Sequence, residues 1–331
     1  MAYSQVSVLS VNDIPAAIAT FAAANGWSVN VSVPAQPTFN HPSKPGSMTF
    51  RIRALISGTN NQNKDVIIED TGVIATSRAV MRSPKLAGLT NNPTVPNPTT
   101  ISMFAGTFPE PYIAVAIAFG VNLYRHMYLG FMETLGNYTG GEVISCTAGS
   151  SNVSSLSVSY TAISMFKNLF GSRRSTAIVA KNESGGVRLV HANNPIPWRI
   201  FSSTTSIATP FNGFLGDEII GGYGDGNNDV MVARGHSTYS GAAIFTPCNL
   251  LISRAIPGDV RFAPVGHPCG VRLVNVRDLT EGQIVQIGSE IWRCYPAVSK
   301  RPELVMSGAS ITGFYRDFES SFQQGYAYRV A

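Results

Sequence analysis

The chain has 331 residues, of which 44% are hydrophobic and 13% are charged, and its formal net charge is +5 at pH 7. This length suffices for one large core or two moderate ones, and the composition excludes disorder driven by charge. A surface with so few charges relies on hydroxyl and amide groups for solubility, and a neighbouring protein can cover it without costly desolvation of charges. The composition therefore favours a subunit of an assembly over a freely diffusing enzyme.

The basic residues are scattered along the chain, and the densest clusters are the pairs Arg173-Arg174 and Lys300-Arg301. Proteins that bind nucleic acid usually concentrate basic residues on one face, so we expect no nucleic-acid partner. No window approaches the about 18 uninterrupted apolar residues that a membrane-spanning helix needs, and the first residues lack the pattern of a signal peptide. We therefore expect no membrane association, and a soluble protein made in a reducing compartment.

The clearest helix is expected near the start of the chain. Asn12 or Asp13 would cap it, Pro15 fits its first turn, and Asn25-Gly26 would end it, since both tolerate the left-handed conformation. Its buried face would comprise Ile14, Ala17, Ile18, Phe21 and Ala22. Strands are expected to follow at 27–33, 48–56, 64–69 and 73–81, so residues 1–89 are predicted to form a helix plus a β-meander.

Residues 90–100, TNNPTVPNPTT, are predicted to form an arm or a linker. Proline lacks the N–H that a helix or a central strand needs. An arm of this kind adds contact area with a neighbouring subunit without needing its own core. The prolines of the segment are therefore candidate interface residues: Pro93, Pro96 and Pro98.

Residues 101–331 are predicted to form a β-rich body. Its most informative part is an apolar strand at 112–119 followed by an aromatic-rich strand at 122–133, because both suit a pleated surface and are bounded by glycines. A short helix is expected at 161–170, a glycine-rich loop at 213–229, and a hairpin at 283–295 that turns at Gly288-Ser289. Further strands are expected at 176–180, 186–191, 230–234, 249–254, 271–276 and 325–330.

The fold class predicted from these elements is mainly β with a minor α part. It consists of antiparallel sandwich- or barrel-like sheets with one N-terminal helix and one short internal helix. The four cysteines lie far apart without a C-x-x-C motif, so buried free thiols are the interpretation: Cys146, Cys248, Cys269 and Cys294.

The sequence DGNND has oxygen-bearing side chains at alternate positions, Asp225, Asn227 and Asp229, as a calcium loop would. It lacks the downstream glutamate of an EF-hand, and a plain turn is favoured because Asp, Gly and Asn mark turns. No metal site is expected beyond this candidate, and no cofactor is expected.

The candidates for catalysis are few. The five histidines show no i, i+4 pairing, and His126 lies between aromatic residues, which favours a packing role. His236 precedes a serine, but no G-x-S-x-G motif and no positioned acid accompany it. A glycosidase pair whose members lie far apart in the sequence remains an alternative. We predict that the protein is not an enzyme.

Three parts of the sequence resemble virion structural proteins of tailed bacteriophages. They are YRHMYLGFM at 124–132 with GNYTGGE at 136–142; the hairpin at 284–295 with Pro296, Lys300 and GYAYR at 325–329; and the helix that closes in Ala-Asn-Gly-Trp27. The resemblance implies a non-enzymatic tail or baseplate subunit, present in several copies, with itself and other virion proteins as partners. It also implies assembly in the bacterial cytoplasm and a final location in the virion tail.

Two alternatives remain open. Within the same class, the chain would be a head-to-tail connector or a capsid decoration protein. In the other class, it would be a receptor- or carbohydrate-binding tail protein that contacts a host surface glycan through exposed aromatic side chains. Trp198, Tyr223 and Tyr239 are the candidates for such contacts, and Trp198 and Tyr223 are also candidate interface residues. Aromatic residues of β-proteins are, however, more often part of the core.

Overall fold

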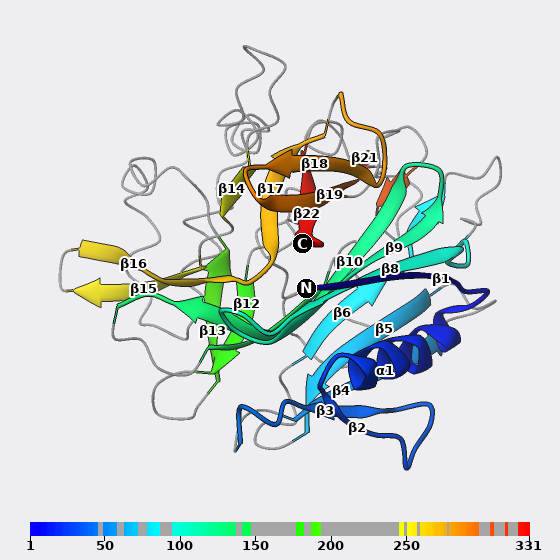
Figure 1. The fold of residues 1–331 in the computed structure, drawn as a ribbon, viewed down its shortest axis with the longest axis horizontal. Helices are drawn as coiled ribbons and strands as arrows, with labels where there is room; N and C mark the ends of the chain where they lie inside the picture. The colour runs from blue at the N-terminus through cyan, green and yellow to red at the C-terminus, as the bar shows by residue number, and fades with distance from the viewer. Residues whose placement is uncertain are drawn as a thin grey trace.

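The computed structural model describes residues 1–45, 49–57, 63–71, 78–86, 95–136, 141–146, 177–181, 187–192, 245–247, 250–256, 259–276, 278–297, 305–307, 315–316 and 324–331. Antiparallel sheets dominate this part of the chain, as Figure 1 shows, and confirm the prediction of a mainly β fold with an N-terminal helix. The predicted helix at 161–170, the loop at 213–229 and the strand at 230–234 lie outside the described residues.

The largest sheet has nine strands in the order β1-β8-β9-β10-β11-β12-β13-β15-β16, and β16 also pairs with the end of β10. β8 and β9 are buried along almost their whole length, so they lack the alternation of strands that face water on one side. The strands are β1 (Ala2–Ser7), β8 (Thr100–Gly106), β9 (Tyr112–Gly120), β10 (Leu123–Thr134), β11 (Glu142–Cys146), β12 (Ala177–Lys181), β13 (Val187–Ala192), β15 (Leu250–Ile256) and β16 (Asp259–Pro268).

A second sheet, which we call the C-terminal sheet, has five strands in the order β14-β17-β22-β19-β18. They are β14 (Phe245–Pro247), β17 (Val271–Asn275), β18 (Gln283–Ile287), β19 (Glu290–Pro296) and β22 (Gln324–Arg329). The predicted hairpin is confirmed as β18 and β19, and Gly288 takes a positive φ of 59° in its two-residue turn. β22 lies at the centre of this sheet although it comes last in the chain.

The N-terminal part combines α1 (Ile14–Ala24) with a sheet in the order β2-β3-β4-β5-β6. A 3₁₀ turn at Val11–Asp13 precedes α1, and the side-chain cap comes from Ser10, one turn earlier than the predicted Asn12 or Asp13. The helix ends at Asn25-Gly26 as predicted, with Gly26 at a φ of 86°. The sheet strands are β2 (Ser28–Asn30), β3 (Thr38–Asn40), β4 (Phe50–Ser57), β5 (Asn63–Asp70) and β6 (Arg78–Arg82). A small sheet joins β7 (Lys85–Leu86), β20 (Val305–Ser307) and β21 (Tyr315–Arg316).

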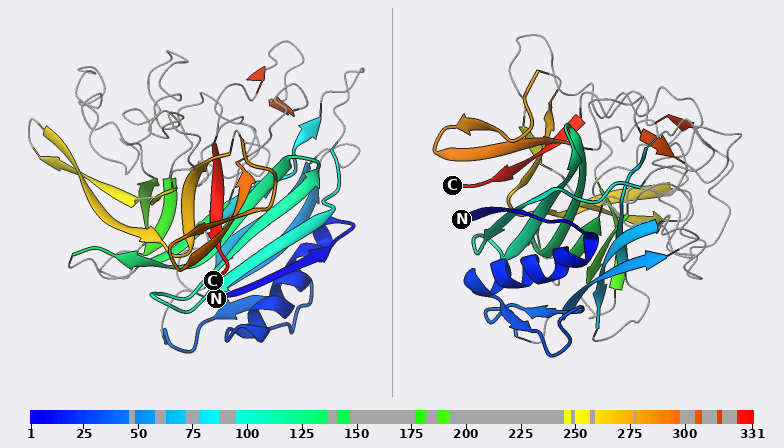
Figure 2. Two further views of the ribbon diagram at one scale, coloured as in Figure 1. Left: turned by 45° about the horizontal axis from the view of Figure 1, so that its top comes forward. Right: turned by 90° about the vertical axis from the view of Figure 1, so that its right-hand side faces the viewer.

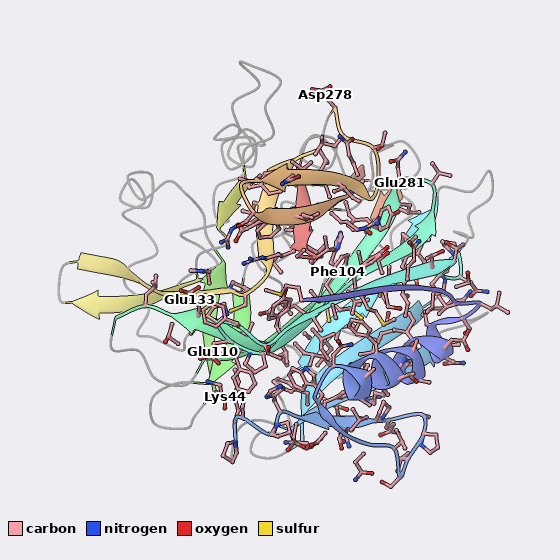
Figure 3. The ribbon with its side chains drawn as sticks, viewed as in Figure 1. Lys44, Phe104, Glu110, Glu133, Asp278 and Glu281 are labelled. Atoms are coloured by element: carbon pink, nitrogen blue, oxygen red, sulfur yellow. The ribbon has the colours of Figure 1, made fainter. Side chains whose placement is uncertain are left out.

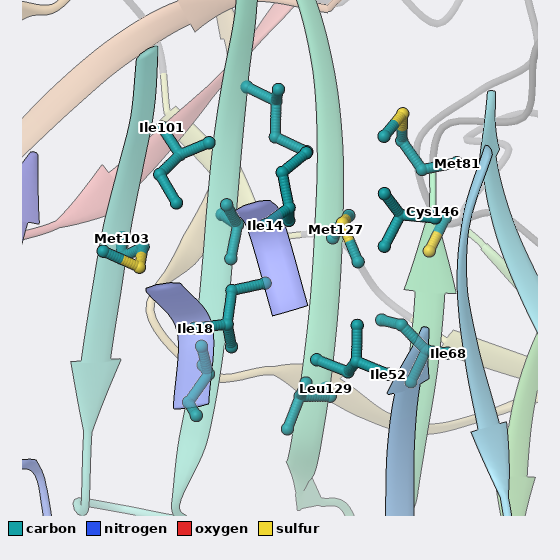
Figure 4. Packing of buried hydrophobic residues seen from close by; sticks show 14 of the residues in the cluster. Ile14, Ile18, Ile52, Ile68, Met81, Ile101, Met103, Met127, Leu129 and Cys146 are labelled. Carbon is teal, nitrogen blue, oxygen red and sulfur yellow. The ribbon is translucent and has the colours of Figure 1, made fainter. Parts of the chain in front are cut away.

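Strands β8 to β11 of the nine-stranded sheet are covered on both faces, and Figure 2 shows the layers from two further sides. Alternate side chains of β9 enter different cores: Ile113 and Val115 pack with α1 and β4, whereas Tyr112 and Ala114 pack with the C-terminal sheet. Figure 4 shows Ile14 and Ile18 of α1 against the first of these faces. β1 pairs with β8, and the core that contains α1, β4 and β9 includes residues from both sides of the 90–100 segment. The parts of the chain before and after the predicted linker therefore share one hydrophobic core.

Candidate functional site

The described part of the proline-rich segment lies along the protein's own surface. Lys64 Nζ donates hydrogen bonds to the Val95 carbonyl (3.0 Å) and to Asn97 Oδ1 (2.6 Å). The N–H of Thr99 donates to the Ala118 carbonyl at 2.8 Å. Pro96 is half-buried and Pro98 is buried, so the Pro98 side chain packs within the chain itself and offers no surface to a neighbouring subunit. The remaining sequence candidates lie outside the described residues: Pro93, Trp198, Tyr223, Asp225, Asn227, Asp229, His236, Tyr239 and Cys248.

Between the nine-stranded sheet and the C-terminal sheet lies a set of buried aromatic side chains, which we call the tyrosine layer. Its rings stack directly: the centroids of Phe104 and Tyr328 are 4.8 Å apart, and those of Tyr112 and Tyr128 are 5.9 Å apart. Figure 3 labels Phe104 in this space. The members are Phe104, Tyr112, Tyr124, His126, Tyr128, Tyr295, Tyr326 and Tyr328.

His126 joins the two sheets through both ring nitrogens. Its Nε2 lies 2.8 Å from the Pro296 carbonyl oxygen, and its Nδ1 lies 2.7 Å from the Tyr328 hydroxyl. A carbonyl only accepts, so Nε2 carries the proton and Tyr328 donates to Nδ1. Burial lowers the pKa of His126 to about 3, although the hydrogen bond to Pro296 acts in the opposite direction. The imidazole is therefore neutral near pH 7 and serves to hold β10 against β19 and β22.

The cysteines of the described part are buried free thiols, as predicted for Cys146, Cys269 and Cys294. Burial raises the pKa of Cys269 and of Cys294 to about 12, and raises that of Cys146 well above its usual range. The thiolate is the nucleophilic form, so none of the three is activated near pH 7. The backbone N–H of Cys269 donates to the Tyr128 hydroxyl at 3.0 Å, which fixes this turn against the tyrosine layer.

Several charged side chains of the described part form ion pairs. Glu69 is buried and accepts from Arg51 Nε at 2.9 Å and from Arg53 Nε at 2.8 Å, across β4 and β5. Lys44 pairs with Glu110 at 2.5 Å near one end of the nine-stranded sheet. Among the described residues, no cluster of three His, Cys, Asp or Glu side chains is placed to hold a metal ion. No helix of this part is long and apolar enough to cross a membrane.

Two strand edges lie on the same side of the molecule. β1 ends the nine-stranded sheet and β18 ends the C-terminal sheet, and the Arg293 guanidinium of β19 lies 4.4 Å from the ring centroid of Tyr3 on β1. Neither strand contains a charged residue. Two of the five β18 side chains are exposed isoleucines, Ile284 at 54% and Ile287 at 42%. The sequence predicted the hairpin but not the position of β18 at a sheet edge.

Contacts with the rest of the chain hold the β18 hairpin in place. Glu281, labelled in Figure 3 above β10, accepts a hydrogen bond of 2.6 Å from the N–H of Asn122 in the turn between β9 and β10. Asn122 has a positive φ of 56°, a conformation that asparagine tolerates better than most residues. At the other end of the hairpin, Glu290 pairs with Arg329 at 2.8 Å. The edge of β18 that no described strand pairs is therefore held in a fixed position.

No known protein family model matches the chain, and no curated protein is significantly similar to it.

Proposed function

We propose that this chain is a structural subunit of a bacteriophage particle, a tail or baseplate component that assembles with copies of itself and with other virion proteins. The observation that carries the proposal is the pair of uncharged strand edges, β1 and β18, on one side of a fixed body. A monomeric protein usually protects such edges with charges, prolines or bulges, since an open edge pairs with other strands. Edges without that protection suit a protein that is covered in its assembled state.

The state of His126 and of the three described thiols supports a structural role for these groups over a catalytic one. His126 is neutral and hydrogen-bonded through both ring nitrogens, and the three described thiols are protonated near pH 7. A general base or a nucleophile needs a reachable group whose pKa lies near the working pH. His126 and Cys269 instead lie in the contact between the two sheets, and Cys146 and Cys294 lie in other hydrophobic clusters.

The placement in a phage particle is supported by the resemblance in sequence. Of the segments that carry it, 124–132, 284–295 and 325–329 fall on β10, β18, β19 and β22, whereas the helix that closes in Ala-Asn-Gly-Trp27 is α1. β10, β19 and β22 contribute to the tyrosine layer and β18 is a sheet edge, so part of the resemblance concerns strands that would matter for assembly. The receptor-binding alternative depends on Trp198, Tyr223 and Tyr239, which lie outside the described residues.

The proposal is tested on purified particles and on the isolated chain. Peptides of this chain should be found by mass spectrometry in phage particles that have been banded on a density gradient. An antibody against the chain should label the tail or the baseplate in electron micrographs. The proposal is wrong if the chain is absent from such particles. It is equally wrong if the isolated monomer turns over a substrate and loses that activity when one acid or histidine is replaced.

A further inference from the structure

We propose that β18 is a self-association strand: two copies of the chain pair their β18 strands antiparallel, about a two-fold axis at Val285, and join their C-terminal sheets into one. This inference rests on the proposed assembly role, and it names the surface and the partner. The inference is based on two features of β18: no described strand pairs with its outer edge, and two of its side chains, Ile284 and Ile287, are exposed.

The unpaired backbone groups at the outer edge of β18 favour another β-strand as the binding partner. β18 pairs with β19 on one side, and the described part of the chain places no strand on the other side. An unpaired edge presents a row of N–H and C=O groups, which another strand satisfies fully. The five residues of β18, QIVQI, include three β-branched residues and neither charge nor proline. In the right-hand view of Figure 2 the hairpin, in orange, stands at the margin of the molecule.

The register of the hairpin determines which backbone groups point to the free edge. Ile287 and Glu290 close the two-residue turn, and such a closing pair exchanges both of its backbone hydrogen bonds. The backbone N–H and C=O groups of successive residues in a strand point to opposite sides. The groups of Val285, two residues before Ile287, therefore also point toward β19, where Val285 lies opposite Trp292. The backbone groups of Ile284 and Gln286 consequently point outward.

Only one antiparallel register pairs both outward residues of each copy. When Val285 lies opposite Val285 of the second copy, each Ile284 lies opposite Gln286 of the other, and the strands exchange about four hydrogen bonds. The same register places Glu281 opposite Ser289, so it brings no like charges together. The arrangement is isologous, in which one surface binds its own copy.

β18 suits this role better than β1, the edge strand of the nine-stranded sheet. The β1 sequence, AYSQVS, has only polar side chains at its well-exposed positions, Gln5 and Ser7. Ile284 and Ile287, by contrast, lose water when a second copy covers β18. A five-residue strand spans only about 17 Å, so its pairing buries less than the roughly 1,200 Å² of a stable complex. We therefore expect a weak dimer in solution, strengthened by the high local concentration inside a particle.

The test is cysteine cross-linking of the full chain, with Cys248→Ser as the background because that thiol lies outside the described residues. Val285→Cys places two thiols opposite each other across the axis, whereas Ile287→Cys places its two thiols about 13 Å apart. Under mild oxidation, V285C should form a disulfide-linked dimer at least about ten times faster than I287C. Near-ultraviolet circular dichroism checks that both variants are folded.

A second pair of variants tests the backbone contact. Gln286→Pro, added to V285C, removes the outward N–H and should abolish the cross-link, whereas Gln286→Ala keeps the N–H and should preserve it. Equal cross-linking of V285C and I287C, no cross-linking of either, or cross-linking that survives Q286P overturns the inference. If the inference fails while the chain is still found in particles, the proposed function stands. If the chain is also absent from particles, the proposed function fails with it.

Discussion

Tyr328 and His126 lie 202 positions apart in the sequence, and the Tyr328 hydroxyl meets His126 Nδ1 at 2.7 Å in the buried space between two sheets. His126 also donates from Nε2 to the carbonyl of Pro296, at the end of β19. The imidazole thus connects β10 to two strands of the C-terminal sheet. Directed hydrogen bonds, as well as stacked rings, hold the two sheets together.

The Tyr328→Phe variant should be less stable by about 1–3 kcal/mol, because His126 Nδ1 would be left as a buried acceptor without its donor. Urea unfolding followed by fluorescence measures the change. Thr20→Val is the control, since the Thr20 hydroxyl donates to the Ala16 carbonyl at an exposed site of α1 and its loss should cost less than about 0.5 kcal/mol. Equal effects of the two variants would show that the buried bond adds nothing.

Stability should fall as the pH is lowered from about 6.5 toward 3. The unfolded chain protonates His126 near the ordinary pKa of histidine, whereas the folded pKa is about 3, so the unfolded state binds more protons in this window. One such group changes the free energy of unfolding by up to about 1.4 kcal/mol per pH unit. His41 and His267, whose pKa values burial also lowers, act with the same sign. His126→Gln should therefore show a shallower slope than the wild type in urea titrations at several pH values, and an unchanged slope would contradict the assignment.

Gly270→Ala should destabilise the protein far more than Gly288→Ala. Both glycines have a positive φ, 66° and 59°, so the backbone strain of an alanine, about 1–2 kcal/mol, is common to both. A Cβ on Gly270 would overlap the ring of Tyr112, whereas a Cβ on Gly288 meets nothing within 4 Å. Overpacking adds about 1–3 kcal/mol to the first variant alone. Similar midpoints in thermal unfolding would refute this close contact.

The described cysteines should be unreactive in the folded protein. With a thiol reagent near pH 7, Cys146, Cys269 and Cys294 should react only after unfolding in guanidinium chloride, because they are buried and protonated. The chain has four cysteines, so at most one should react in the native state. Fast reaction of two or more would contradict the structure.

Lys64→Met should loosen the proline-rich segment without unfolding the body. The variant keeps the aliphatic stem but loses the hydrogen bonds to Val95 and Asn97. Hydrogen exchange measured by mass spectrometry should be several-fold faster over 95–100, while global stability changes by less than about 1 kcal/mol. Lys44→Met, which removes an ion pair to Glu110 elsewhere, is the control and should leave exchange at 95–100 unchanged.

The local elements of this fold are readable from the sequence because short-range patterns determine them. The apolar run at 112–119 and the turn at Gly288-Ser289 appear where their residues predict them, and so does the face of α1, except that Ala17 is half-buried and Ala19 is buried as well. Short-range patterns do not show how far along a strand the neighbouring elements extend and bury its side chains. Alternation along β4 predicts that Ile56 is buried like Phe50 and Ile52, yet Ile56 is 36% exposed near the end of the strand. Similarly, the cap at Ser10 depends on a 3₁₀ turn that precedes α1.

The candidate site depends on long-range order, which local sequence reasoning does not supply. The aromatic character of 122–133 indicated a packing role for His126, but its partners on β19 and β22 follow from sheet order and register. The same holds for β18, whose edge position comes from the order of the C-terminal sheet. Composition alone selected Pro98 as an interface residue, although Pro98 lies buried beside its own β-sheet.

The central place of β22 in its sheet affects how the protein is made. β22 lies between β17 and β19 and pairs with both. These two strands therefore cannot complete their pairing until residues 324–329 have been synthesised. During synthesis, both would leave the ribosome with their inward edges unpaired and with the tyrosine layer lacking Tyr326 and Tyr328. Completion of the second sheet must then follow translation of the last strand, and nascent chains that stall before it would be prone to aggregate.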